Sequence, residues 1–350
     1  MSNASATHLT RRGILAAGGA LGLGAVLAAC GDDDAKSGGS GSTASAAAKS
    51  GPWSFKDDRG QTAKADKIPS NIVAFVGVAA ALYDYGIQAK GVFGPTRTTD
   101  GKADVQAGDM DISKVTILGN VWGEFNVEKY AALTPDLLVS TLFDNVGTLW
   151  YVPEESKKKI EAVGAPSVGI SVYDRQLAEP LQRMLELAKS LGADVTSAKV
   201  TEAKKRFEDA AARLRAAAKA KPDIKVLAGS ASQELFYVSG SNLSVDLEYF
   251  KALGVNFVEP PESAKKQGGG WYESLSWENV DKYAADIIMM DNRTSAIQPD
   301  AITEATWKKL PAVKAGQVIA RNPEPILSYD KCTPLLEELA EALEKAKKVS

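Results

Sequence analysis

The sequence predicts an α/β protein with two lobes, each built on a mainly parallel sheet and joined to the other by one long helix. Short β-branched runs alternate with helical stretches in both halves of the chain, a pattern typical of βα units around parallel strands. Residues 194–220, which contain no glycine or proline, separate the two halves. A short sequence pattern also recurs in the two halves, which favours two related lobes.

The predicted strands fall into two sets. Strands of the first half are expected at Asn71–Val76, Gly91–Gly94, Val115–Leu118, Asp136–Thr141 and Ser167–Val172. Strands of the second half are expected at Ile224–Gly229, Val255–Glu259, Asp286–Asp291 and Gln317–Arg321.

The long helix is predicted over Asp194–Ala220. Its apolar residues recur at spacings of three and four, the repeat of one helix face: Val200, Ala203, Phe207, Ala210, Leu214 and Ala217. At 1.5 Å per residue such a helix would be roughly 40 Å long, which suits a strut between two lobes. We therefore expect a first lobe over 53–175, a helical connector over 176–221 and a second lobe over 222–350.

The recurring pattern places a glutamate eight residues before an aspartate that opens a buried strand. Glu128 precedes Asp136 in this way in the first half, and Glu278 precedes Asp286 in the second. The purely structural interpretation is that each glutamate lies near the beginning of a helix, where the helix dipole favours a carboxylate by about 0.3–1 kcal/mol.

The N-terminus is predicted to be a signal peptide over residues 1–29. The pair Arg11-Arg12 precedes an uncharged run over Ile14–Ala29, shorter than the roughly 20 residues of a membrane-spanning helix. Leu27-Ala28-Ala29-Cys30 resembles a bacterial lipobox, in which the cysteine is acylated and the chain is cut before it. We expect twin-arginine export, a lipidated Cys30, and a flexible tether over 30–52 because that segment is rich in Gly, Ser and Ala.

The residue counts exclude several kinds of site. The one histidine, His8, lies in the predicted signal peptide, which excludes Ser-His-Asp catalysis and histidine-based metal sites from the mature chain. Cys332 is expected to be a small buried residue. Asp109–Ser113 begins like an EF-hand loop, but Lys114 and Asn120 stand where glycine and glutamate are needed, so no metal site is expected. Without Arg11 and Arg12, the 41 basic residues fall to 39 against 44 acidic ones, so the mature chain has a net charge of about −5, which predicts no nucleic-acid surface.

Three stretches resemble a known family. They are Pro69–Ala74, Leu133–Leu138 and Trp307–Val318. With the lipobox, tether, two lobes and long helix, they resemble the helical-hinge substrate-binding lipoproteins of ABC importers, which deliver ferric siderophores, haem or cobalamin. Ala285 departs from the family pattern, which often has proline there. The resemblance implies a class III fold with two Rossmann-like lobes, no enzymatic activity, no cofactor, and a monomer that docks on a permease dimer with its ATPase.

The ligand is expected in a cleft between the lobes, because ligands of open α/β sheets bind beyond the carboxyl ends of the strands. Aromatic residues and arginines follow the predicted strands at these positions. The candidate ligand-binding residues are Arg97, Trp122, Phe143, Trp150, Tyr151, Tyr173, Arg175, Tyr237, Trp271, Tyr272, Arg293 and Tyr329.

Such a set fits a ferric siderophore, whose iron is already wrapped by six chelator oxygens, so that the protein supplies aromatic walls and hydrogen-bond donors. Few arginines reach the predicted cleft, which favours a neutral or singly positive, ferrioxamine-like hydroxamate over a triply negative tris-catecholate. Haem or cobalamin binding is an alternative. A lipid-anchored extracytoplasmic hydrolase and a purely structural lipoprotein are disfavoured alternatives.

The resemblance also gives Glu128 and Glu278 a second interpretation. In this family, glutamates at the matching positions, one per lobe, dock against arginines of the two permease halves. The protein is accordingly expected outside the cytoplasm, anchored to the cell membrane through Cys30 alone. The sequence leaves open whether the host has one membrane or two.

Overall fold

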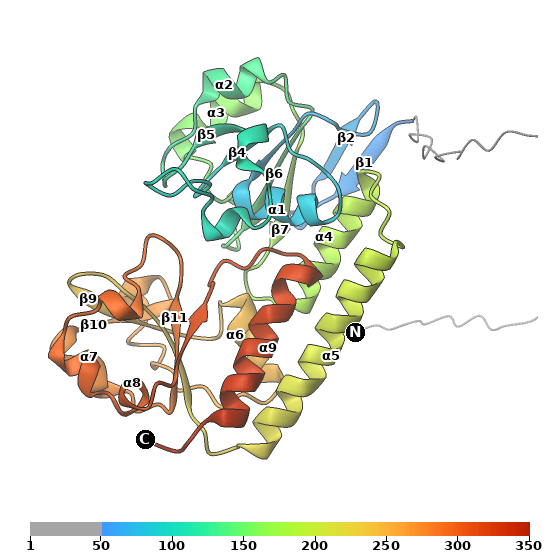
Figure 1. Cartoon of the computed structure of the whole chain (residues 1–350). Helices are drawn as coiled ribbons and strands as arrows, with labels where there is room; N and C mark the ends of the chain where they lie inside the picture. Colours follow the sequence, from blue (N-terminus) through green and yellow to red (C-terminus); the bar gives the residue numbers. More distant parts are fainter. Residues whose placement is uncertain (1–50) are drawn as a thin grey trace, which may run out of the picture. The chain divides into compact units, whose positions relative to one another are not determined.

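The computed structural model describes residues 51–350. The predicted signal peptide, Cys30 and nearly all of the predicted tether lie outside the described residues. Within the described part, two five-stranded sheets form the centres of two lobes (Figure 1). The predicted two-lobed α/β fold is confirmed. No helix within residues 51–350 is long and apolar enough to cross a membrane.

The sheet of the first lobe is parallel throughout, in the order β5-β4-β3-β6-β7. Its strands are β3 (Ile72–Phe75), β4 (Gly91–Phe93), β5 (Thr116–Gly119), β6 (Leu137–Leu142) and β7 (Ser167–Ser171). The central strands β3 and β6 are buried along their whole length, as expected where helices cover both faces of a parallel sheet. Every strand predicted for this half is present, with ends shifted by no more than a residue.

The helices and the hairpin of the first lobe surround this sheet. The helices are α1 (Val76–Asp84), α2 (Val127–Ala132) and α3 (Glu154–Ala162), and the antiparallel hairpin is formed by β1 (Trp53–Lys56) and β2 (Thr62–Ala65). The hairpin loop covers the outer edge of β7, where Asp57 accepts the N–H of Gly169 at 3.0 Å and Asp58 accepts that of Ser171 at 2.8 Å. This edge strand is therefore closed to pairing with another chain.

The sheet of the second lobe is mixed, in the order β10-β9-β8-β11-β12. β8 (Val226–Ala231), β11 (Ile287–Asp291) and β12 (Val318–Arg321) are parallel, whereas β9 (Leu235–Ser239) and β10 (Tyr272–Ser276) pair antiparallel. The helices of this lobe are α6 (Val245–Ala252), α7 (Ala305–Lys309), α8 (Pro311–Lys314) and α9 (Tyr329–Lys345).

The prediction of a strand over Val255–Glu259 is wrong. This segment makes one isolated bridge, Phe257 with Val226, at the beginning of β8. β9 pairs only with the end of β8, from Gly229 to Ala231, so the segment covers the part of β8 that β9 leaves free. Pro260 and Pro261 follow directly and have no N–H for a longer ladder.

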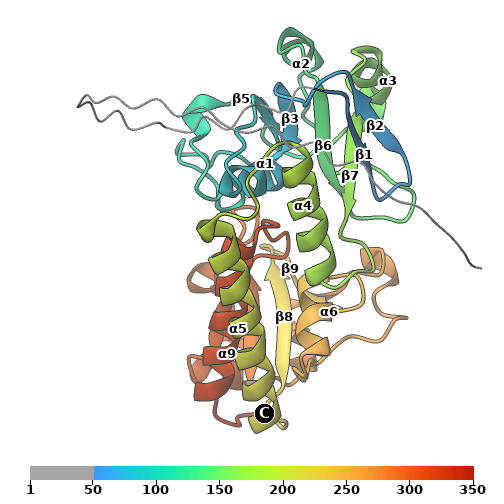
Figure 2. The same ribbon diagram turned by 90° about the vertical axis from the view of Figure 1, so that its right-hand side faces the viewer.

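Two helices connect the sheets along the chain: α4 (Ala178–Ser190) and α5 (Ala198–Ala220). α5 runs side by side with α9 (Figures 1 and 2), and every residue of its predicted apolar stripe is buried. The helix begins later than predicted because the Asp194 carboxylate accepts the N–H and O–H of Thr196, at 3.0 and 2.7 Å. Such a local turn competes with the helix.

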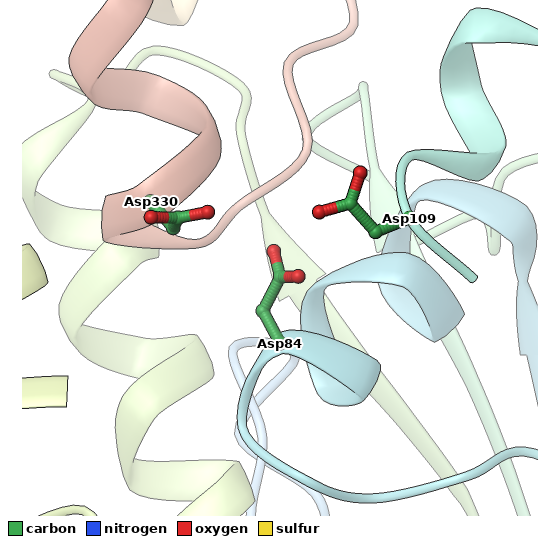
Figure 3. A group of neighbouring side chains, drawn as sticks. All are labelled: Asp84, Asp109 and Asp330. Atoms are coloured by element: carbon green, nitrogen blue, oxygen red, sulfur yellow. The ribbon is translucent and has the colours of Figure 1, made fainter. Parts of the chain in front are cut away.

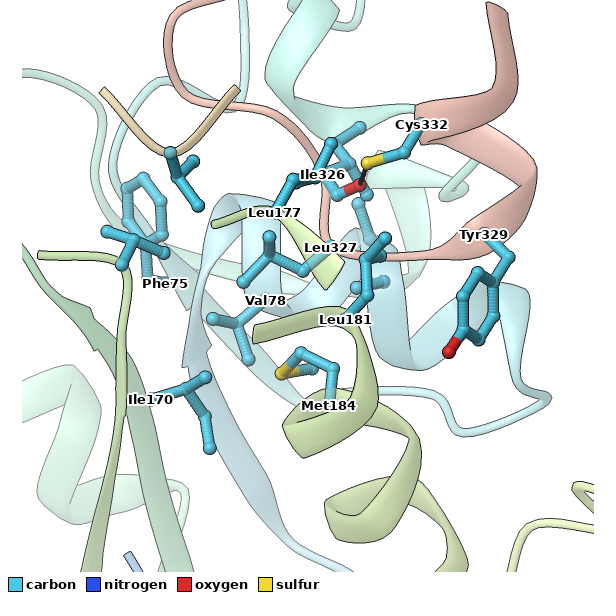
Figure 4. Packing of buried hydrophobic residues seen from close by; sticks show 14 of the residues in the cluster. Phe75, Val78, Ile170, Leu177, Leu181, Met184, Ile326, Leu327, Tyr329 and Cys332 are labelled. Atoms are coloured by element: carbon cyan, nitrogen blue, oxygen red, sulfur yellow. Dashed lines mark hydrogen bonds between the residues drawn. The ribbon is translucent and has the colours of Figure 1, made fainter. Parts of the chain in front are cut away.

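The core of the first lobe continues into the segment that leads to α9. Val78 of α1 and Leu181 of α4 pack in one cluster with Leu327, which precedes α9 (Figure 4). In the same cluster Cys332 is fully buried, and its Sγ donates to the main-chain oxygen of Ile326 at 3.2 Å. Burial raises the pKa of this thiol, and the prediction that Cys332 is a small buried residue is confirmed.

The aspartate of each recurring pattern precedes a strand and accepts hydrogen bonds from main-chain N–H groups of neighbouring segments. Asp136 accepts the N–H of Asn71 at 2.8 Å, at the beginning of the neighbouring strand β3. Asp286 accepts the N–H of Lys225 at 2.8 Å and those of Val349 and Ser350 at 2.7 and 2.8 Å. Asp286 therefore holds the C-terminal residues against the second lobe.

Candidate ligand-binding cleft

A cavity of about 400 Å³ lies between the two lobes, at the carboxyl ends of their strands. Its walls come from the segment after β6 in the first lobe and, in the second lobe, from the ends of β8, β9, β11 and β12 and the beginning of β10. Its lining consists of Phe143, Trp150, Gly229, Ser230, Tyr237, Ser239, Ser244, Trp271, Tyr272, Asp291, Arg293, Arg321, Pro323 and Glu324. The position agrees with the expected site at the strand ends.

Aromatic rings form the wall of this cavity and a layer behind it. Phe143 and Trp150 pack with ring centroids 4.6 Å apart, and Phe143 lies 6.0 Å from Trp271 of the other lobe. Tyr237 and Tyr272 make an edge-on pair at 5.1 Å. Because these rings come from both lobes, a flat or branched organic ligand in the cavity would contact apolar surface on two sides.

Three predicted residues pack against this wall without lining the cavity. The Trp122 ring lies 4.7 Å from that of Trp150 and 5.0 Å from that of Tyr151, and the Tyr173 ring lies 6.4 Å from that of Trp271. Trp122 is 63% exposed, at the rim. Burial raises the pKa of Tyr151 to about 12, so its hydroxyl stays a neutral hydrogen-bond donor.

The remaining predicted residues lie elsewhere. Arg97 is exposed, and its main-chain N–H donates to Asn120 at 2.8 Å. Arg175 pairs with Glu179 at 3.3 Å on the surface. Tyr329 is buried in the core (Figure 4). Its ring packs 5.5 Å from that of Phe207 in α5. It begins α9 directly after Ser328, and the helix turns its side chain toward α5 instead of the cavity.

Arg293 is bound by two carboxylates of its own lobe. Its Nη2 donates to Asp291 Oδ2 at 2.7 Å, its Nε donates to the same carboxylate at 3.1 Å, and its Nη1 donates to Glu324. Burial acts to lower the pKa of Arg293, but the bonds to Asp291 and the charge of Glu324 outweigh it and raise that pKa above its ordinary value. The Arg293 guanidinium therefore stays positively charged, and the carboxylates of Asp291 and Glu324 balance that charge.

Glu324 also joins the two lobes. Its Oε2 accepts the side-chain N–H of Gln106 at 2.9 Å and the indole N–H of Trp150 at 3.2 Å, both from the first lobe. Nearby, Thr294 of the second lobe donates to Asp104 of the first at 2.5 Å. Glu324 thus holds two groups of the cavity wall in place: the Trp150 indole of the other lobe and the Arg293 guanidinium of its own lobe.

Arg321, at the end of β12, was not among the predicted site residues. It is 4% exposed, and its Nε and Nη2 donate to the two carboxylate oxygens of Asp246 at 2.7 and 2.8 Å. Asp246, in the first turn of α6, is 1% exposed. The sequence did hold a signal, because Arg321 and Asp291 are the last residues of predicted strands, whereas the prediction considered only the loops after strands.

Comparisons with known proteins show the family of the chain. Residues 75–325 match the periplasmic binding protein family. The chain belongs to the periplasmic binding protein family. A crystal structure of DesE, a ferric-siderophore receptor protein from Streptomyces coelicolor, shares 74% sequence identity with this periplasmic binding protein, covers 85% of the chain and 100% of its own, and superposes with a TM-score of 0.84.

More distant structures share the fold of this binding protein. The siderophore periplasmic binding protein from the fuscachelin gene cluster of Thermobifida fusca is 22% identical, with 79% of this chain and 96% of that chain covered and a TM-score of 0.56. The FhuD protein from S. pseudintermedius is 20% identical, with 84% and 98% covered and a TM-score of 0.56. No protein of the curated set matches the chain.

A larger hollow of about 690 Å³ lies on the first lobe of this periplasmic binding protein, between the hairpin loop and α3. Two of its charged side chains, Arg59 and Asp144, are bound within the chain. Arg59 donates to Asp57 at 2.6 Å, and Asp144 accepts main-chain N–H groups of its own loop at 2.8 to 3.1 Å. The smaller cavity between the lobes differs from this hollow in being lined by aromatic rings from both lobes.

Three carboxylates, those of Asp84, Asp109 and Asp330, approach one another where α1 meets the beginning of α9 (Figure 3). Lys331 Nζ lies 2.6 Å from Asp109 and 3.7 Å from Asp330, and Ser328 donates to Asp84 at 2.5 Å. The group is thus bound by other side chains of this protein. That the mature chain holds no metal site stays a prediction.

The two glutamates of the recurring pattern occupy matching positions. Glu128 lies exposed in the first turn of α2, and Glu278 lies exposed in the first turn of the 3-10 helix η4 (Trp277–Lys282). Hydrogen bonds to its own main-chain N–H and to Ser276 hold the pKa of Glu278 below its ordinary value. The carboxylate of Glu278 is therefore charged at neutral pH.

Proposed function

We propose that this periplasmic binding protein is a receptor that takes up a ferric siderophore between its lobes and delivers it to an ABC importer. The observation that carries the proposal is the ring-lined cavity between the lobes in a chain 74% identical to a ferric-siderophore receptor. A wrapped ferric complex brings its own six iron ligands, so a cavity of aromatic rings and hydrogen-bond donors is sufficient to hold it.

The charges of the cavity favour a neutral or singly positive ferric hydroxamate. Arg293 is paired with Asp291, Arg321 is paired with Asp246, and Glu324 adds another negative charge. A tris-catecholate complex carries three negative charges and needs an excess of cations. Because the guanidinium charges are already balanced by carboxylates of the chain, a ferrioxamine-like complex is the better fit.

The test is a titration of the purified protein with a panel of complexes. Ferrioxamine B, a ferric tris-catecholate, haem and cobalamin are added separately, and tryptophan emission is recorded. Ferrioxamine B should quench the emission strongly, because Trp150 and Trp271 line the cavity and Trp122 lies at its rim. Tighter binding of the tris-catecholate would overturn the ligand class, and binding of haem or cobalamin alone would overturn the siderophore assignment.

The signal peptide and lipobox support export and anchoring of the receptor. We expect Cys30→Ala to abolish labelling by diacylglycerol and to leave the protein uncleaved or released from the membrane. Arg11→Lys with Arg12→Lys should block export if the twin-arginine route is used. A Cys30→Ala variant that still takes the lipid label would remove the lipobox assignment.

Glu128 and Glu278 are proposed as the contacts with the permease. One exposed carboxylate on each lobe can orient a two-lobed body on a dimeric partner and raise the encounter rate. Glu128→Ala with Glu278→Ala should leave ligand affinity unchanged and sharply reduce uptake in cells carrying the cognate permease.

A matched control is Glu155→Ala with Asp300→Ala, which removes exposed carboxylates from the first turns of α3 and of the 3-10 helix η5 (Pro299–Ala301). This control should transport normally. Normal uptake by the Glu128/Glu278 double variant would leave only the helix-dipole role for these residues.

A further inference from the structure

Two arginines line the cavity, and they differ in how many of their nitrogens are occupied. All three side-chain nitrogens of Arg293 donate to carboxylates, those of Asp291 and Glu324. In Arg321, only Nε and Nη2 donate to a carboxylate, that of Asp246. Within residues 51–350, the third nitrogen, Nη1, has one long contact, 3.4 Å to the Ser239 hydroxyl.

The occupied and the open sides of Arg321 face different surroundings. Asp246 is almost fully buried and is not part of the cavity lining, whereas Ser239 and Arg321 both line the cavity. The bidentate pair therefore holds the guanidinium plane so that its Nη1 side is the side toward the cavity. A charged nitrogen in a side chain that is 4% exposed, with one weak neutral partner, lacks the hydrogen bonds that a buried guanidinium normally makes.

We propose that Arg321 Nη1 donates a charge-assisted hydrogen bond to a chelating oxygen of the bound ferric complex, and that Asp246 is the positioning residue that aims it. This inference rests on the proposed function and adds the residue that recognises the complex. Chelating oxygens of a hydroxamate carry negative charge even when the whole complex is neutral, so they accept such a bond. Arg293 holds Glu324 and Asp291 in place instead.

The main test measures affinity for ferrioxamine B in variants of this pair. Arg321→Met with Asp246→Leu removes both charges together, because a lone buried charge would endanger folding. Loss of one charge-assisted hydrogen bond should weaken binding by about 10- to 100-fold. The matched control is Arg213→Met, which breaks a similar bidentate pair with Glu344 on the surface of α5, at 2.9 and 2.6 Å, and should bind like the wild type.

A second measurement separates recognition from structure. A hydrogen bond to a chelating oxygen shifts the visible charge-transfer band of a ferric hydroxamate on binding, and this shift should be lost in the double variant at saturating protein. Arg321→Lys, which retains a charge beside Asp246 but not the fork, covers the case in which the double variant does not fold. It should also bind more weakly and lose the shift.

The outcomes distinguish this inference from the proposed function. Wild-type protein that binds no ferric hydroxamate would overturn the proposed function itself. Wild-type binding with unchanged affinity and unchanged band shift in the Arg321 variants would overturn the inference alone, and a water molecule would then satisfy Nη1. Asp246→Asn should give a smaller loss than Arg321→Lys, because the guanidinium remains and only its aim is relaxed.

Discussion

Replacement of Trp271 by alanine tests the cavity most directly. The indole lines the cavity and spans the lobe boundary, with its ring 6.0 Å from Phe143 and 6.4 Å from Tyr173. The conformation of the loop that carries Trp271 is determined by glycine φ angles and a main-chain hydrogen bond. Gly269 and Gly270 have φ angles of 63° and 91°, which glycine adopts freely, and the Trp271 oxygen accepts the N–H of Gly240 at 2.8 Å.

The magnitude follows from these contacts. Because the loop does not depend on the indole, Trp271→Ala should change ligand contact more than it changes folding. Loss of a well-packed aromatic anchor costs about 1–3 kcal/mol of binding free energy, or about 5- to 150-fold in affinity. Trp271 is itself a fluorophore, so the affinity for ferrioxamine B should be measured by calorimetry or equilibrium dialysis.

Trp122→Ala provides the comparison. Trp122 is 63% exposed and does not line the cavity; its ring packs against that of Trp150, which does, and against that of Tyr151. Its removal should weaken binding by only about two- to threefold, as for a rim contact. Wild-type affinity in Trp271→Ala, or a larger loss in Trp122→Ala, would refute the placement of the ligand against the Trp271 wall.

Three further predictions concern charges. Asp246→Ala should lower the free energy of unfolding by about 3–5 kcal/mol, because it strands the buried Arg321 charge, and Arg321→Met added to it should restore much of this stability in urea denaturation. Glu324→Gln should raise the affinity for a ferric tris-catecholate by about tenfold or more, since it removes a negative charge from the cavity; unchanged affinity would contradict the charge argument. Burial acts to raise the pKa of Asp286, but the hydrogen bonds it accepts outweigh this and hold the pKa below its ordinary 3.8. Its stabilising effect is therefore present above about pH 4 and lost as pH falls below that value, so the difference in unfolding free energy between wild type and Asp286→Asn should shrink on acidification.

The parallel strands could be predicted from the sequence because they are buried on both faces. A continuous apolar run such as Ile72–Phe75 can be recognised in the sequence without knowledge of its neighbours. β9 and β10 were missed because they pair antiparallel at one edge of the second sheet, outside the βα repeat on which the prediction rested, and β10 carries the polar residues Glu273, Ser274 and Ser276. The error at Val255–Glu259 has the same origin, since pairing partners are set by tertiary structure.

The sequence could predict which loops lie near the candidate site, but not which of their side chains face the cavity. The strand-end rule brings Phe143, Trp150 and Arg293 to one cavity, because the carboxyl ends of parallel strands meet at one edge of each sheet. Trp271 also lines the cavity, but it does so from the amino end of the antiparallel strand β10. The same rule failed for Tyr329, which follows a segment after β12 but belongs to the first turn of a helix. Which side of its helix a residue faces depends on what that helix packs against, here α5.

The sequence and the structure both favour a weakly charged ligand, but for different reasons. Few arginines were expected near the ligand, and a weakly charged complex was inferred from that scarcity. In the structure the relevant quantity is not the number of arginines but their partners: Asp291 and Glu324 neutralise Arg293, and Asp246 neutralises Arg321. Asp246 precedes Arg321 by 75 residues, a pairing that no local pattern indicates. A cavity with bound guanidinium groups holds a neutral complex by directed hydrogen bonds, whereas a cavity with unpaired ones would attract anions regardless of their shape.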